Sequence, residues 1–150
     1  MTLARRMVGI VALIVAAQGS ARADQLTMIY APDGIALSGY DAVSYFTESR
    51  PAHGSPENAV TWRGATWYFE SPQSESQFEM NPEAYAPQFG GYCAYSLSEG
   101  EVASGAPDAY VIYDGRLYLM HEADILAQKR GDLPLIVQEA ARHWPAALGR

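Results

Sequence analysis

The feature that most constrains the fold of this chain is a pair of short aromatic runs joined by Arg63-Gly64. Glycine readily adopts the positive φ that a two-residue hairpin turn requires, so this dipeptide predicts a β-hairpin. Pairing Trp62 with Ala65 sets the register, because side chains on a strand alternate between its two faces. One face then collects the side chains that we expect in the core, namely Val60, Trp62, Ala65, Trp67 and Phe69.

Two short helices are predicted after this hairpin. Ser71 suits the cap of the first helix because its hydroxyl accepts a free backbone N–H, and Pro72 suits the first helical turn. Phe78 lies within this helix and is expected to anchor it in the core. Asn81-Pro82 repeats the pattern of cap and start and predicts the second helix, which Pro87 ends.

A second hairpin is predicted over residues 109–120. Asp114-Gly115 joins two apolar runs there, and this dipeptide is among the strongest short-range hairpin signals. Pairing Tyr113 with Arg116 divides the apolar side chains between both faces, so both faces need a covering partner. We therefore expect this hairpin and the first one (60–69) to form one antiparallel sheet covered by helices.

The C-terminal part of the chain is predicted to be helical. One helix runs from Ala123 to Arg130 and ends at Gly131, and another starts near Pro134 and runs towards Trp144. The second carries an apolar stripe that should pack on the sheet, formed by Leu133, Val137, Ala140, Ala141 and Trp144. These patterns predict a single α+β domain over residues 24–150: a small antiparallel sheet of two hairpins covered by short helices, with a C-terminal helical extension.

The order of these motifs resembles the YHS domain family. The resemblance is carried by W-R-G-A-T-W-Y-F (62–69), the capped helix that follows, and N-P-E-A-Y (81–85). The chain also resembles the longer, exported bacterial form of the family, through G-Y-D-A-V-S-Y-F (39–46) and Q-F-G-G-Y-C-A-Y (88–95). The similarity covers roughly residues 35–144 and implies a treble-clef-like core.

The metal ligands of shorter YHS domains are missing at the matching positions of this chain. Those domains resemble small metal modules, with cysteines just after the aromatic strand and again on the helix. This sequence has Glu70 and Ser74 there, and Gly39-Tyr40-Asp41 where a cysteine-bearing turn would lie. We expect Asp41 to cap a short helical turn over residues 42–45 instead. The family's metal-binding role therefore does not carry over to these positions.

The first 23 residues predict a signal peptide. Arg5-Arg6 form a basic start, residues 7–17 an apolar run too short to span a membrane, and Ala21-Arg22-Ala23 a cleavage site. We expect a protein of the periplasm or a secreted protein, without a membrane segment in its mature form. The general export route is favoured over the twin-arginine route, because the residues around Arg5-Arg6 match the latter poorly.

The chain is acidic, with a formal net charge of −7. Removal of residues 1–23 would take away Arg5, Arg6 and Arg22 and no acidic residue, which leaves seven basic against 17 acidic residues, or −10. This charge disfavours nucleic acid and anionic lipid as partners, because both require Lys or Arg to neutralise phosphate. A partner protein or a homodimer remains as a candidate assembly.

Cys93 is the only cysteine, so no internal disulfide can form. Four roles remain for it: a buried small hydrophobe, an intermolecular bridge, a metal ligand or a reactive thiol. Its neighbours Tyr92, Ala94, Tyr95 and Leu97 favour burial, since free cysteines are among the most buried residue types.

Three residues form the candidate metal site. Met120 and His121 lie together at the end of a predicted strand, and thioether and imidazole both suit copper. With Cys93 they make a copper(I)-like ligand set, and His53, in a predicted surface loop over 50–58, is a further candidate. The alternative is a core methionine beside a solvated histidine. We thus expect an exported YHS-domain protein that binds or handles a soft metal such as copper. The competing reading is a non-catalytic structural or interaction domain with no bound metal.

Enzymatic activity is not predicted. The sequence contains no P-loop, no G-x-S-x-G elbow, no H-E-x-x-H, no C-x-x-C and no dinucleotide fingerprint. A cysteine hydrolase needs a base oriented by a third group, and no pattern places His53, His121 or His143 beside Cys93. We therefore predict no catalytic residue and no organic cofactor site.

Overall fold

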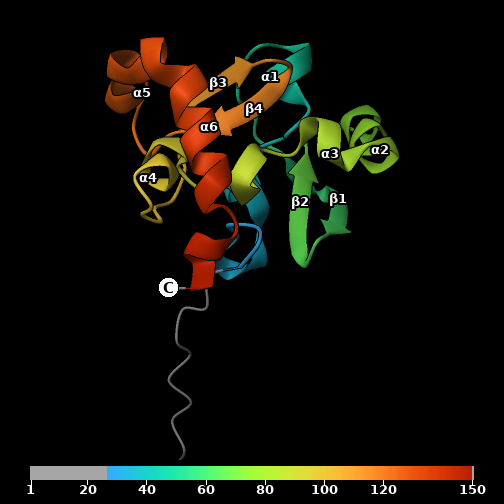
Figure 1. Ribbon diagram of the computed structural model, residues 1–150. Helices are drawn as coiled ribbons and strands as arrows, with labels where there is room; N and C mark the ends of the chain where they lie inside the picture. The colour runs from blue at the N-terminus through green and yellow to red at the C-terminus, as the bar shows by residue number, and fades with distance from the viewer. Residues whose placement is uncertain (1–26, 150) are drawn as a thin grey trace, which may run out of the picture.

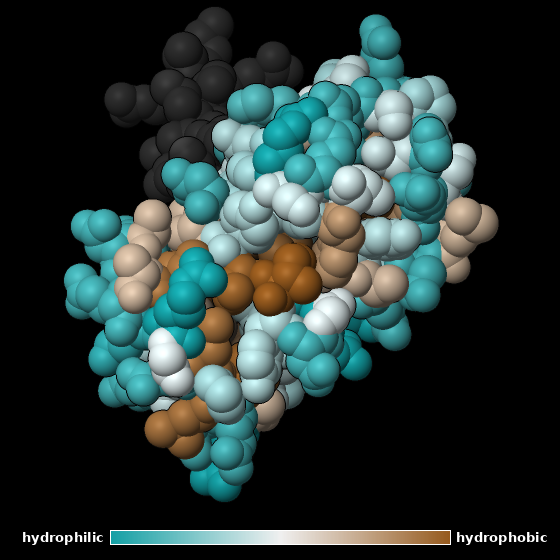
Figure 2. All heavy atoms as spheres, turned by 90° about the horizontal axis from the view of Figure 1, so that it is seen from above, coloured by the Kyte–Doolittle hydropathy of each residue, from teal (hydrophilic) through white to brown (hydrophobic). Residues whose placement is uncertain are grey.

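The computed structural model describes residues 27–149, so the predicted signal peptide lies outside the described residues. The fold is α+β, as predicted, with two hairpins, several short helices and a longer C-terminal helix (Figure 1). No helix within residues 27–149 is long and apolar enough to cross a membrane. Seen from above, the surface is mainly hydrophilic around a smaller hydrophobic area (Figure 2).

The first hairpin has the predicted register. Strands β1 (Ser55–Trp62) and β2 (Ala65–Phe69) are antiparallel, and Trp62 pairs with Ala65. Ala65, Trp67 and Phe69 are buried, which confirms the predicted core face. β1 begins inside the segment that was predicted to be a surface loop, so that boundary is wrong. The pairing is irregular between Ser55 and Ala59, and such an irregular edge tolerates the proline that suggested a loop.

The second hairpin also has the predicted register. Strands β3 (Tyr110–Tyr113) and β4 (Arg116–Leu119) are antiparallel, with Tyr113 opposite Arg116. The two hairpins nevertheless form separate two-stranded sheets, so the prediction of one joined sheet is wrong. A single bridge occupies one outer edge of each sheet: Ile35 pairs with Thr66 of β2, and Cys93 pairs with Leu119 of β4. Apolar patterning determines the buried face of a hairpin but not the neighbour along its edge.

The helices are short except for the last. They are α1 (Ser44–Thr47), α2 (Pro72–Met80), α3 (Pro82–Tyr85), α4 (Ala94–Ser98), α5 (Ala123–Lys129) and α6 (Leu133–His143). The hydroxyl of Ser71 accepts the backbone N–H of Ser74 at 3.2 Å, which confirms the predicted cap of α2. Phe78 is fully buried, and its ring centroid lies 5.0 Å from that of Trp67, so it anchors α2 as predicted.

The core consists of three clusters of buried residues, and β4 lies between the first two. Leu117 and Leu119 belong to the cluster around the first hairpin, whereas Tyr118 and Met120 belong to the cluster around Cys93. This arrangement explains why both faces of the second hairpin are apolar. Both are buried along β4.

Helix α6 packs mainly on α4, whereas it was predicted to pack on the sheet of the two hairpins. Its buried residues are Leu133, Ile136 and Ala140, and the first two also join the cluster of the second hairpin. The predicted stripe is therefore wrong at Ala141, which is exposed. Ile136 is buried instead, so α6 is turned slightly about its axis relative to the predicted orientation.

The N-terminal described segment is held against a short 3-10 turn, η3 (Gln88–Gly91). Tyr30 donates its backbone N–H to the carbonyl of Gly90 at 2.8 Å. A Cβ at Gly90 would lie 2.0 Å from the carbonyl oxygen of Met28, so this approach requires glycine. Met28 and Ile29 are thereby placed beside the turn that precedes Cys93.

Candidate functional site

Cys93 lies at the start of α4 and is 0 % exposed. Its sulfur accepts the backbone N–H of Ser96 at 3.4 Å and that of His121 at 3.2 Å. The predicted burial of this cysteine is confirmed. The sulfur caps α4 and joins it to the chain just after β4.

The structure brings the backbone of the three candidate metal ligands together. Met120 is fully buried in the same core cluster as Cys93, and His121 follows directly. The ring of His121 is exposed, and its Nδ1 lies 2.9 Å from the carbonyl oxygen of Ser104. The side chains thus reach different surroundings, with both sulfur atoms inside the core and the imidazole at the surface.

The other two histidines are engaged separately. The ring of His53 stacks on Tyr40 at a centroid distance of 4.1 Å, and the Nδ1 of His143 lies 2.7 Å from the carbonyl oxygen of Leu97. Across residues 27–149, no three side chains of His, Cys, Asp or Glu gather closely enough to hold a metal ion.

At the positions expected to match the cysteines of shorter YHS domains, Glu70 and Ser74 make contacts within the fold. Glu70 lies 3.5 Å from the guanidinium of Arg50, and the hydroxyl of Ser74 lies 3.3 Å from that of Ser71. Neither side chain supplies a thiolate, and the carboxylate of Glu70 already lies near the charge of Arg50. The residues present therefore do not fit the metal site of the shorter YHS domains.

Asp41 has a structural role that is larger than the predicted cap. It is fully buried, and its Oδ1 accepts the backbone N–H of Val43 at 2.8 Å, just before α1. Its Oδ2 accepts the N–H of Glu70, 29 residues away, at 3.0 Å. One carboxylate therefore holds the segment before α1 against the end of β2.

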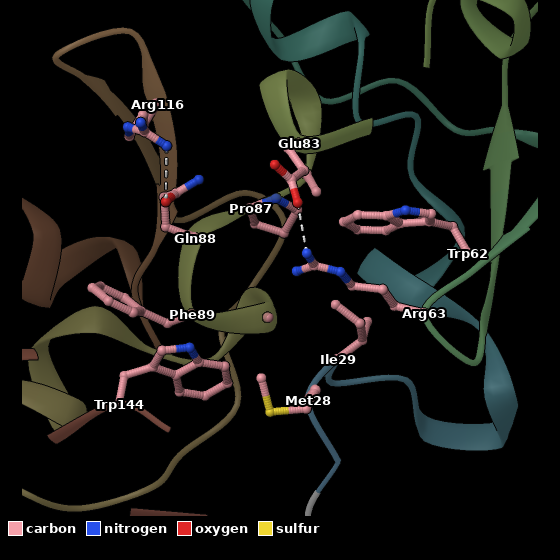
Figure 3. A pocket seen from close by; sticks show the side chains of 12 residues that line it. Met28, Ile29, Trp62, Arg63, Glu83, Pro87, Gln88, Phe89, Arg116 and Trp144 are labelled. Carbon is pink, nitrogen blue, oxygen red and sulfur yellow. Dashed lines mark hydrogen bonds and ion pairs between the residues drawn. The ribbon is translucent and has the colours of Figure 1, made fainter. Parts of the chain in front are cut away.

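A second candidate site is an open cleft between the turns of the two hairpins (Figure 3). We call it the arginine cleft and define it by Trp62, Arg63, Glu83, Phe89, Arg116 and Trp144. Its volume is about 210 Å³. This is below the range of roughly 300–1,000 Å³ that is typical of sites for drug-sized ligands, so the cleft suits a smaller molecule.

Aromatic rings form two sides of the arginine cleft. Trp62 lies on one side, and Phe89 and Trp144 lie on the other with their centroids 6.0 Å apart (Figure 3). All three rings are only half-buried, although large aromatic side chains gain most from complete burial. Accessible apolar surface therefore faces the cleft from both sides.

Two arginines supply the positive charge of the cleft. Arg63 pairs with Glu83 at 2.7 Å, and its guanidinium carbon lies 4.5 Å from the ring centroid of Trp62. Arg116 donates a hydrogen bond of 3.4 Å to the side-chain oxygen of Gln88. Among residues 27–149, no carboxylate lies within ion-pair distance of Arg116.

The sequence patterns did not predict this cleft. Its six defining residues come from the end of β1 and the turn after it, α3, η3, the start of β4 and the residue after α6, which only the tertiary fold brings together. One signal was present, namely an arginine as the first residue of a two-residue hairpin turn. Such a turn favours Asn, Asp or Gly because its φ is positive.

Comparison of this chain with known protein families, with curated proteins and with solved structures found no match.

Proposed function

We propose that this protein is an exported, non-catalytic YHS-like binding domain and that the arginine cleft is its ligand site. The observation that carries the proposal is the convergence of three half-buried aromatic rings and two arginines on one cavity. Small-molecule sites have this composition, since apolar walls supply affinity and a few polar groups fix orientation.

Binding suits the cleft better than catalysis. Its ionisable side chains are Arg63, Arg116 and Glu83. A guanidinium stays protonated at physiological pH, so it orients an anion but does not transfer a proton. Glu83 is exposed and paired with Arg63, which leaves no acid and base arranged around a common point.

The chain's three tryptophans provide the test. Trp62 and Trp144 line the cleft, whereas Trp67 is buried in the core. We would record the three indole N–H signals of ¹⁵N-labelled protein while adding benzoate, benzamide, benzyl alcohol or benzylamine. At least one probe should move the signal of Trp144 or Trp62 to saturation and move that of Trp67 least.

Trp144→Ala should abolish the effect of that probe on Trp62, because one wall of the cleft is removed. The persistence of the Trp67 signal would show that the variant is folded. If no probe of any charge moves either cleft signal, the cleft is not a site for small aromatic ligands and the proposal is wrong.

A soft-metal site at Cys93 is the second candidate, and one observation favours it. The backbone N–H of His121 lies 3.2 Å from the sulfur of Cys93, and Met120 shares the core cluster of that cysteine. Thiolate and thioether are ligands that copper(I) prefers. Binding would require the metal to enter the core and the ring of His121 to leave Ser104.

Copper retention after desalting tests this second candidate. Under reducing conditions, the protein should retain copper(I) and its thiol should become protected from labelling, because the metal binds deprotonated sulfur. Cys93→Ser and Met120→Leu should both lose copper. Met80→Leu is the matched control, since Met80 is 79 % exposed. A thiol that labels only after denaturation, with no retained copper, would contradict the metal site.

A further inference from the structure

We propose that the ligand of the arginine cleft is a small aromatic carboxylate. Its carboxylate would bind Arg116 and compete with Glu83 for Arg63, while its ring would lie against the aromatic walls. This inference rests on the proposed binding function and adds the chemical class of the ligand.

The charge of the cleft is opposite to that of the chain. The formal net charge is −7. Two arginines and one glutamate nevertheless define the cleft, which leaves one positive charge. One carboxylate neutralises that charge. The charge of the cleft therefore favours an anion over a cation.

Arg116 is the more available of the two arginines. Its hydrogen bond to Gln88 is long, at 3.4 Å, and the acceptor is neutral. A guanidinium presents two parallel N–H groups that match the two oxygens of a carboxylate, and such charge-assisted bonds are stronger than neutral ones. A ligand carboxylate is thus a better partner for Arg116 than the amide that it now contacts.

Glu83 competes with the proposed ligand for Arg63. Its carboxylate already occupies the guanidinium of Arg63 within the cleft (Figure 3). The side chains of Arg63 and Glu83 are 50 % and 72 % exposed, and ion pairs this exposed contribute little to stability. A ligand carboxylate can therefore displace Glu83 from Arg63 at small cost.

The backbone of Arg63 supports a role beyond the turn itself. Its φ is 50°, in the left-handed region, and the same turn position of the second hairpin is Asp114 with φ 49°. Asp is a usual residue at such a position and Arg is not. The side chain of Arg63 also has a contact beyond the turn, because its guanidinium lies over Trp62 inside the cleft.

Matched probes and matched variants test the ligand class. Benzoate and benzamide have nearly the same shape and differ in charge, so calorimetric titration of both isolates the carboxylate. Benzoate should bind about tenfold or more tightly than benzamide. Its affinity should fall about tenfold in Arg116→Gln, rise severalfold in Glu83→Gln, and weaken as salt is added.

Arg50→Gln is the control for the loss of one positive charge, because Arg50 is exposed and outside the cleft. It should leave benzoate binding within about twofold of wild type. Equal affinity for benzoate and benzamide, or weaker benzoate binding in Glu83→Gln, would overturn the inference while leaving the cleft as a binding site. Failure of every uncharged and charged probe would instead contradict the proposed function itself.

Discussion

The substitution Asp41→Asn should destabilise the domain although it changes almost no volume. Asp41 is fully buried, and each of its carboxylate oxygens accepts one backbone N–H, from Val43 and from Glu70. An asparagine offers one acceptor oxygen and one NH₂ group. Whichever way the amide turns, a donor faces a donor, so the N–H of either Val43 or Glu70 loses its partner.

The magnitude follows from that single lost bond. A hydrogen bond to a charged group contributes about 1.5–3 kcal/mol, and an unpaired buried donor costs about 1–3 kcal/mol. These are two descriptions of the same loss, so the expected decrease in the free energy of unfolding is about 1.5–3 kcal/mol. A typical domain has only about 5–15 kcal/mol in total. The variant should remain folded but melt clearly earlier.

Urea denaturation followed by circular dichroism measures this effect. The midpoint should fall in Asp41→Asn while the slope stays constant, because the surface exposed on unfolding is unchanged. Asp33→Asn is the matched control, since Asp33 is exposed and asparagine tolerates its positive φ of 58°. That control should stay within about 0.5 kcal/mol of wild type. Equal midpoints for the two variants would refute the role assigned to the Asp41 carboxylate.

Three further outcomes are expected. Trp67→Ala should cost about 3–5 kcal/mol in urea melts because the ring is fully buried, and Met80→Ala should be nearly neutral; equal losses would show that the buried face is misassigned. Burial raises the pKa of Tyr45 above its ordinary value of 10.0, so the folded state favours the neutral phenol. The stability that Tyr45 provides is present below that value and is lost as pH rises above it. Tyr45→Phe should therefore lessen the loss of stability between about pH 10 and pH 12, and an unchanged loss would count against this linkage. The free energy of unfolding of Arg63→Asn should stay within about 1 kcal/mol of wild type, because asparagine suits the positive φ of this turn position and so offsets the lost ion pair. The variant should nevertheless bind benzoate more weakly. A large loss of stability would contradict the backbone argument.

Features set by neighbouring residues could be predicted from the sequence. Both hairpin registers follow from two-residue turns, and the cap of α2 follows from Ser71 and Pro72, because each depends on only a few adjacent positions. The separation of the hairpins into two sheets could not be predicted. It depends on Ile35 and Cys93, which occupy strand edges from distant parts of the chain.

The candidate sites divide in the same way. The burial of Cys93 could be predicted from its apolar neighbours, whereas its hydrogen bond from His121 required the fold. The second bond of Asp41 reaches Glu70 across 29 residues, and no local pattern encodes such a partner. The arginine cleft could not be predicted, because its residues meet only in the tertiary structure. The one local signal was the unusual turn residue Arg63.

A crystal structure of the protein with bound benzoate would show directly whether the arginine cleft holds an aromatic carboxylate. We expect the ring between Trp62 and Trp144, with a carboxylate oxygen within about 3.2 Å of the Arg116 guanidinium. We also expect Glu83 to be released from Arg63. A ring in the cleft with its carboxylate turned to solvent and the Arg63–Glu83 pair intact would contradict this expectation.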